Sequence, residues 1–136
     1  DMVELVTEAT LPYQERILID PNMPRPEEFM AAADVLVLPS YREGFGVVII
    51  EAAACGIPAI ASRVYGITDA VEEGVSGLLF PVGDTLALRD HMANLFSDIE
   101  KRTRMGHAAR KRVCANFEKK NVCRAFVGYY ATFLDS

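Results

Sequence analysis

Cysteine is scarce in this chain, and its spacing excludes two kinds of site. The 136 residues contain three cysteines, Cys55, Cys114 and Cys123. An odd number without paired spacing fits neither a disulfide framework nor a cysteine-ligated metal site. We therefore interpret all three as reduced thiols of a cytoplasmic protein, with Cys55 as a small packing residue.

Basic blocks and long apolar runs are also missing. The formal net charge at pH 7 is −5, which argues against nucleic acid or an anionic membrane surface as the main partner. No apolar run approaches the length of a membrane span, and no signal peptide is visible at Asp1-Met2-Val3.

Clusters of acids and histidines are absent too, so the sequence predicts no metal site. The two histidines, His91 and His107, fall on late helices, on parts that we expect to face solvent. We assign them no catalytic role.

Hydrophobic residues make up 51% of the chain, which suits a layered domain with buried strands. A length of 136 residues is enough for one sizeable core. We expect residues 1–136 to form a single α/β domain.

The stretch from Pro39 to Ala61 is the most informative part of the sequence. The apolar run of residues 35–38 predicts a buried strand, Glu43-Gly44-Phe45-Gly46 predicts a turn, and a helix should then run to Cys55. After Gly56 a second strand is expected at residues 58–61. This order favours a parallel sheet with a right-handed crossover, whose loop lies at the carboxyl ends of the strands, where open α/β sheets bind ligands.

The residues of this loop predict a site for phosphates or sugar hydroxyls. Gly44 and Gly46 carry no side chains, so the N–H groups at the helix start can approach an oxygen-rich or anionic ligand. Glu43 precedes the helix and Glu51 lies about two turns along it, so the two carboxylates could hold different polyols. A dinucleotide fingerprint is excluded, because its third glycine position is Ile49.

Each carboxylate also has a simpler interpretation. Glu43 could be an acid that complements the helix dipole, and Glu51 could be a solvated helix residue. Against this, the apolar neighbours of Glu51 predict that its side chain is buried nearly all round, and a buried charge is costly unless it is paired or bound.

Further elements are predicted on both sides of this unit. Strands are expected at Val3–Ala9 and Glu15–Asp20, a helix from Pro26 to about Ala33, a loop at Ser62–Asp69, and a strand at Gly77–Phe80. Three helices should follow, the first capped by Asp84. Their expected apolar positions are Leu88, Met92, Leu95 and Phe96; then Met105, Ala109 and Val113; then Val122, Phe126, Tyr129, Tyr130 and Phe133. We interpret the last stripe as core.

Taken together, Pro39-Ser40, the EGFG turn, Glu51 and the A-x-A-C-G-x-P segment that follows it resemble the donor-binding signature of retaining GT-B glycosyltransferases. The similarity is to the group-one class, which uses nucleotide-activated sugars. It covers roughly residues 27–117 and includes Ala32-Ala33-Asp34-Val35, Val71-Glu72-Glu73-Gly74, Ser76-Gly77-Leu78-Leu79-Phe80-Pro81, Asp84, Ala87-Leu88 and Met105-Gly106.

The resemblance implies a fold, a function and a role for each site residue. The fold would be a Rossmann-like parallel sheet flanked by helices, forming part of the C-terminal, donor-binding domain of a GT-B enzyme. Glu43 would be the catalytic-site residue that holds hydroxyls of the transferred sugar. The backbone of Gly44, Phe45, Gly46 and Val47 would contact the sugar and the diphosphate, and Glu51 would accept from the ribose hydroxyls. No cofactor is implied, because the nucleotide sugar is a substrate.

The chain departs from the family pattern in two places. Residues 62–69 differ from the glycine pair that relatives often carry, and resemble some polysaccharide-assembly transferases instead. By the resemblance, we expect the acceptor-binding domain, and the Arg and Lys that relatives direct at the diphosphate, to lie outside residues 1–136. Arg42 and Arg63 do not match those positions, and we interpret them as surface charges or partners of Glu43 and Asp69.

These departures lead to three expectations about the chain by itself. We expect it to transfer no sugar without the acceptor-binding domain, to bind nucleotide weakly, and to associate with itself as a homodimer. Any membrane association would be peripheral and would act through the full-length enzyme.

Two other classes of function stay open. The chain could be a nucleotide- or sugar-binding module without transferase activity, because the same motif serves both purposes. It could also be a signalling receiver whose loop acids bind a metal, but Pro39-Ser40 occupies the strand end where a receiver carries its phosphorylated Asp.

Overall fold

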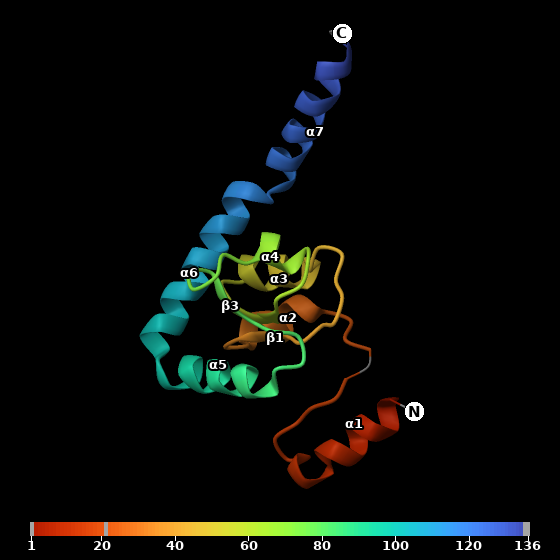
Figure 1. The fold of residues 1–136 in the computed structure, drawn as a ribbon, viewed down its shortest axis with the longest axis vertical. Helices are drawn as coiled ribbons and strands as arrows, with labels where there is room; N and C mark the ends of the chain where they lie inside the picture. The colour runs from red at the N-terminus through yellow and green to blue at the C-terminus, as the bar shows by residue number, and fades with distance from the viewer. Residues whose placement is uncertain (1, 21, 135–136) are drawn as a thin grey trace.

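A computed structural model describes residues 2–20 and 22–134 of the chain. Its centre is a three-stranded sheet of β1 (Leu36–Leu38), β2 (Ala59–Ser62) and β3 (Gly77–Phe80), in that order and all parallel (Figure 1). The sequence predicted the α/β class, the parallel sheet and these three strands. The loop Glu43-Gly44-Phe45-Gly46, called the glycine turn below, lies between the first strand and the helix that follows it. The Leu36 N–H donates to the Pro58 carbonyl at 3.0 Å, at the start of the pairing between β1 and β2, and the strand order places β1 at one edge of the sheet.

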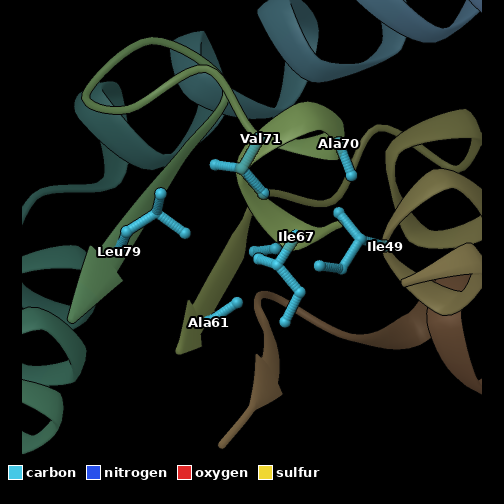
Figure 2. Close-up of a cluster of buried hydrophobic side chains, with 7 residues drawn as sticks. Ile49, Ala61, Ile67, Ala70, Val71 and Leu79 are labelled. Atoms are coloured by element: carbon cyan, nitrogen blue, oxygen red, sulfur yellow. The ribbon is translucent and has the colours of Figure 1, made fainter. Parts of the chain in front are cut away.

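Helices cover both faces of the sheet. On one face, α3 (Val47–Ala54) and α4 (Ile67–Ala70) pack on the strands, and Figure 2 shows their shared cluster around Ile49, Ala61 and Ile67. On the other face, α5 (Thr85–Ser97) and α6 (Ile99–Asn116) cover Ile60, Leu78 and Phe80. Successive strand residues alternate between these two clusters because side chains alternate across a sheet. Both faces are therefore covered, which explains why the strands are apolar apart from Ser62 at the end of β2.

The two helices of the second face begin at aspartates. The Asp84 carboxylate accepts from the Ala87 N–H at 2.9 Å at the start of α5, as the sequence predicted. The Asp98 carboxylate accepts from the Lys101 N–H at 2.8 Å at the start of α6. Each cap satisfies an N–H group that has no partner within its helix.

The two strands predicted before residue 21 are wrong. Residues 2–10 form helix α1 (Met2–Thr10), a 3₁₀ turn η1 (Leu11–Tyr13) follows, and residues 17–20 have no regular structure. α1 packs on η1 and lies apart from the sheet (Figure 1). A strand needs a neighbour for its backbone hydrogen bonds, and neither segment has one, whereas the helix at residues 2–10 satisfies its hydrogen bonds within itself.

The next two segments agree with the sequence more closely. Helix α2 (Pro26–Ala32) has its proline at the helix start and Glu27 and Glu28 in the first turn. The loop predicted at residues 62–69 is interrupted by the short helix α4, which begins after Gly66. Among the described residues, no helix is both long and apolar enough to cross a membrane.

Two apolar stripes are more exposed than the sequence suggested. On α5 only Leu95 is fully buried, and Met92 and Phe96 are exposed. On α7 (Lys119–Leu134), the residues of the stripe from Phe126 to Phe133 are each about three-fifths exposed, so the core interpretation is wrong. α7 packs on α6 and then extends away from the sheet (Figure 1), so no other described element covers its stripe.

Because of this exposed stripe, we expect the chain to associate with itself as its concentration rises. Exposed apolar side chains of this size favour burial against a second surface. The double variant Phe126→Lys/Tyr130→Lys should be monomeric in sedimentation experiments and should stay folded, since both side chains are exposed. Val127→Lys/Ala131→Lys adds the same charge at the same spacing on another face of α7 and should behave like the parent. A parent chain that is monomeric at every concentration would contradict this prediction.

A second prediction concerns the packing of α6 against the end of α3. A Cβ at Gly106 would lie 2.0 Å from the Gly56 carbonyl oxygen, so Gly106→Ala must separate two backbones. We expect it to lower the free energy of unfolding by about 1 to 3 kcal/mol. A Cβ at Gly128 on α7 would meet nothing within 4 Å, so Gly128→Ala should be neutral or favour the helix. Urea unfolding of both variants tests this, and equal stabilities would show that α6 does not approach Gly56 so closely.

Candidate functional site

The glycine turn joins β1 to α3 at the carboxyl end of the sheet, as the sequence predicted. Within it the Ser40 hydroxyl donates to Glu43 Oε1 at 2.7 Å, and both residues are half-buried. This hydrogen bond engages one oxygen of the Glu43 carboxylate and holds the group in one orientation. Glu43 precedes the first turn of α3, so it does not act as a first-turn acid of that helix.

Gly46 immediately precedes α3 and has a left-handed backbone conformation. Its φ of 66° is one that side chains rarely allow, and its carbonyl accepts from the Ile49 N–H at 2.9 Å. A Cβ at Gly46 would lie 3.3 Å from Ile49 Cδ1 and 3.4 Å from Ile67 Cγ1. Gly46 is buried, and both its backbone conformation and its close neighbours disfavour a side chain there. A Cβ at Gly44, by contrast, would meet no atom within 4 Å. The open side of the loop lies at Gly44.

The first N–H groups of α3 are the donors that this loop presents. The opening residues of a helix have no acceptor one turn earlier, and the helix dipole adds a partial positive charge there. Val47 is the first residue of α3 and its side chain is 60% exposed. The backbone at this position can therefore donate to an anionic or oxygen-rich ligand.

Glu51 is exposed, so the prediction that it is buried is wrong. The buried residues of α3 are Ile49, Ala52 and Ala53, which share the side of the helix that faces the rest of the protein. Glu51 is two residues from Ile49, and successive helix residues are about 100° apart, so it points the other way. It shares its exposed face with Val47, one turn earlier, and so lies beside the helix start.

Gly66 packs against the backbone of the glycine turn, a role that the sequence did not predict. A Cβ at Gly66 would lie 2.2 Å from the Gly44 carbonyl oxygen and 3.1 Å from Phe45 Cα. Its φ of 86° is also positive, and it immediately precedes α4. The Tyr65-Gly66 turn therefore packs directly on the backbone of Gly44 and Phe45. The sequence showed a glycine at this place in a loop, but not which segment it would meet.

Arg42 and Arg63 are both exposed, as expected of surface charges, but neither pairs with Glu43 or Asp69. Arg63 pairs with Glu73, which is neither of its expected partners. Asp69 interacts through its carbonyl, which accepts from Arg112 at 2.9 Å. Arg42 is exposed and makes no ion pair with a described residue, so it is the cation closest in sequence to the turn that is available to a ligand.

The remaining candidates lie away from the turn. His91 is half-buried on α5, with Nε2 3.3 Å from the Leu79 carbonyl oxygen, so the expectation that it faces solvent is wrong; His107 is exposed as expected. Within residues 2–20 and 22–134 the cysteines form no disulfide and no three potential ligands gather into a metal site. A cavity of about 930 Å³ lies between β1 and α5, on the face opposite α3.

The turn and the first part of α3 combine carboxylate acceptors with backbone donors. Glu43 and Glu51 can accept from hydroxyl groups, while the start of α3 can donate to phosphate or sugar oxygens. No described residue near the turn provides an activated nucleophile. The surface is therefore suited to holding a ligand that carries both hydroxyls and phosphates.

Comparisons with known proteins agree with this chemistry. The family model described as glycosyl transferases group 1 matches residues 4–112. The N-acetyl-alpha-D-glucosaminyl L-malate synthase of Bacillus anthracis is 34% identical over 120 residues, which are 88% of this chain and 32% of that protein.

Two solved structures are also similar. Sucrose-phosphate synthase from Thermosynechococcus elongatus is 31% identical with a TM-score of 0.85, over 98% of this chain and 34% of that one. Anabaena HepE, solved in complex with UDP and glucose, is 27% identical with a TM-score of 0.73, over 77% of this chain and 29% of that one. The chain thus spans about a third of the length of these proteins.

The family match covers most of the chain, including the glycine turn, α3 and all three strands. The likeness to GT-B glycosyltransferases inferred from the sequence is confirmed by the fold. The chain belongs to the group 1 glycosyl transferase family.

Proposed function

We propose that residues 1–136 are part of the donor-binding domain of a retaining glycosyltransferase, and that they bind its nucleotide sugar. The observation that carries this proposal is the glycine turn, in which a carboxylate oriented by Ser40 lies four residues before the start of α3. The solved HepE structure, whose title names UDP and glucose, supports a uridine nucleotide as the first ligand to test. The longer protein would transfer the sugar to a glycan or lipid-linked acceptor.

Each residue of the turn has a proposed role in holding the donor. Glu43, held by Ser40, accepts hydrogen bonds from the transferred sugar. The backbone of Gly44, Phe45 and Gly46 completes the sugar site and reaches the diphosphate, and the Val47 N–H donates to it. Glu51, exposed one turn along α3, accepts from the ribose hydroxyls.

The proposed reaction keeps the configuration of the sugar. The bond between the anomeric carbon and the phosphate oxygen breaks, and the acceptor oxygen bonds to the same carbon from the same face. The acceptor proton moves to the leaving phosphate. The described residues contribute by positioning and by stabilising charge at the start of α3, and Glu43 is not required as a nucleophile.

Two parts of the proposal concern the setting of the protein. We place it in the cytoplasm, where its three free thiols would stay reduced. An acceptor-binding domain elsewhere in the longer protein would face the glycine turn and provide the second half of the site.

Removing the Glu51 carboxylate should weaken UDP binding without unfolding the protein. A carboxylate that accepts from hydroxyls contributes about 1.5 to 3 kcal/mol, so Glu51→Ala should raise the Kd for UDP at least about tenfold in calorimetry. Glu51→Gln keeps the shape and part of the hydrogen bonding, and should lose less. Glu100→Ala removes an exposed carboxylate from α6 and should bind as the parent does. Unchanged affinity in Glu51→Ala would rule out the ribose assignment.

A side chain at Gly66 should displace the glycine turn and so weaken UDP binding. Gly66→Ala places a Cβ where the Gly44 carbonyl lies, so either the turn or α4 must move. Gly74→Ala is a matched control, since its φ of 75° is equally left-handed but its Cβ would meet nothing within 4 Å. We expect both to lose about 1 kcal/mol of stability from the backbone, and only Gly66→Ala to lose UDP affinity. Equal affinities in the two variants would show that the turn does not depend on Gly66.

A further inference from the structure

One aromatic contact joins the glycine turn to the far end of the chain. The rings of Phe45 and Phe117 have centroids 5.5 Å apart and an interplanar angle of 64°, which is an edge-to-face arrangement. Phe45 lies in the turn and is 39% exposed, while Phe117 directly follows the last residue of α6. Such pairs are stabilising beyond the area that they bury, because the positive edge of one ring meets the negative face of the other.

Phe117 is the anchored member of this pair. It is half-buried and packs against the cluster of Ala53, Ala109 and Val113, together with Ile50 of α3. Its N–H donates to the Val113 carbonyl at 2.8 Å, which fixes the backbone at the end of α6. The ring of Phe117 is therefore held by the core, and Phe45 rests on it from a loop.

The turn is consequently held at two places by distant segments. Gly66 meets the backbone of Gly44 and Phe45, and Phe117 meets the ring of Phe45. Neither contact uses the open side at Gly44. A loop that is already ordered before a ligand arrives loses less conformational entropy on binding, so contacts of this kind raise affinity without touching the ligand.

We propose that Phe117 is a positioning residue, which holds Phe45 so that the Gly44–Val47 backbone is ordered for a nucleoside diphosphate. This inference rests on the proposed function for its ligand, but the ordering of the turn is a property of the unliganded chain. The substitution Phe117→Leu separates this role from core packing, because leucine can still fill the space beside Ile50 and Val113 but offers no aromatic ring to Phe45.

The first experiment measures amide hydrogen exchange of the unliganded chain. Phe117→Leu should accelerate exchange of the Ile49 N–H, whose hydrogen bond to the Gly46 carbonyl closes the turn, by about 3- to 10-fold, and should leave the three strands unchanged. Phe117→Tyr keeps the ring and should exchange like the parent. Phe126→Leu removes an exposed ring from α7, away from the turn, and is the matched control. Unchanged exchange of the Ile49 N–H, or equal acceleration in turn and strands, would overturn the proposal.

The second experiment measures UDP affinity by calorimetry. Phe117→Leu should raise the Kd by about 3- to 10-fold, Phe117→Tyr should restore it, and Phe45→Leu/Phe117→Leu should bind no more weakly than Phe117→Leu alone. Losses that simply add in the double variant would overturn the coupling between the rings. If the parent does not bind UDP but Phe117→Leu still loosens the turn selectively, the proposed function fails while the positioning by Phe117 is upheld.

Discussion

The close approach of two backbones, at Gly66 and Gly44, is the constraint on which the candidate site depends. A Cβ at Gly66 would lie 2.2 Å from the Gly44 carbonyl oxygen, so the glycine turn and the start of α4 touch without a side chain between them. This contact supports the turn from the protein side and leaves its other side open. The shape of the ligand-facing surface is therefore set by a residue that would not touch the ligand.

The sheet brings these two segments together. β1 and β2 are parallel neighbours, so the segments that follow them emerge at the same edge of the sheet. One segment leads to α3 through Gly46 and the other leads to α4 through Gly66, and both glycines have positive φ values. The Ile49 and Ile67 side chains, one from each helix, then meet in the cluster shown in Figure 2. The packing of α3 and α4 in this cluster therefore also fixes the geometry of the glycine turn.

Family membership and site chemistry come from separate observations. The group 1 match establishes the family over residues 4–112, and the solved structures establish the fold. The structure of this chain itself shows the site features, which are the hydrogen bond from Ser40 to Glu43, the exposed position of Glu51 and the open N–H groups of α3. Both lines lead to a ligand that carries hydroxyls and phosphates, which is why a nucleotide sugar is the donor that we propose.

The central unit from β1 to β2 could be predicted because its signals are local. A run of apolar residues, a glycine turn and a helix ended by Gly56 each depend on neighbours in sequence, and the Asp84 cap depends on a residue three positions away. The motif between Glu43 and Glu51 likewise identified the family. For these features the sequence by itself was sufficient, since chain connectivity already brings the interacting groups together.

Only the tertiary structure decided the features that depend on distant neighbours. Residues 3–9 have a pattern that a strand could use, but no described strand lies beside them, so they form α1. Glu51 is exposed because the core lies on the other side of α3, and the α7 stripe is exposed because no described element covers it. The contacts of Gly66 with Gly44 and of Phe117 with Phe45 join segments that are 22 and 72 residues apart. Sequence spacing carries no information about such contacts, because they exist only once the sheet has placed both partners.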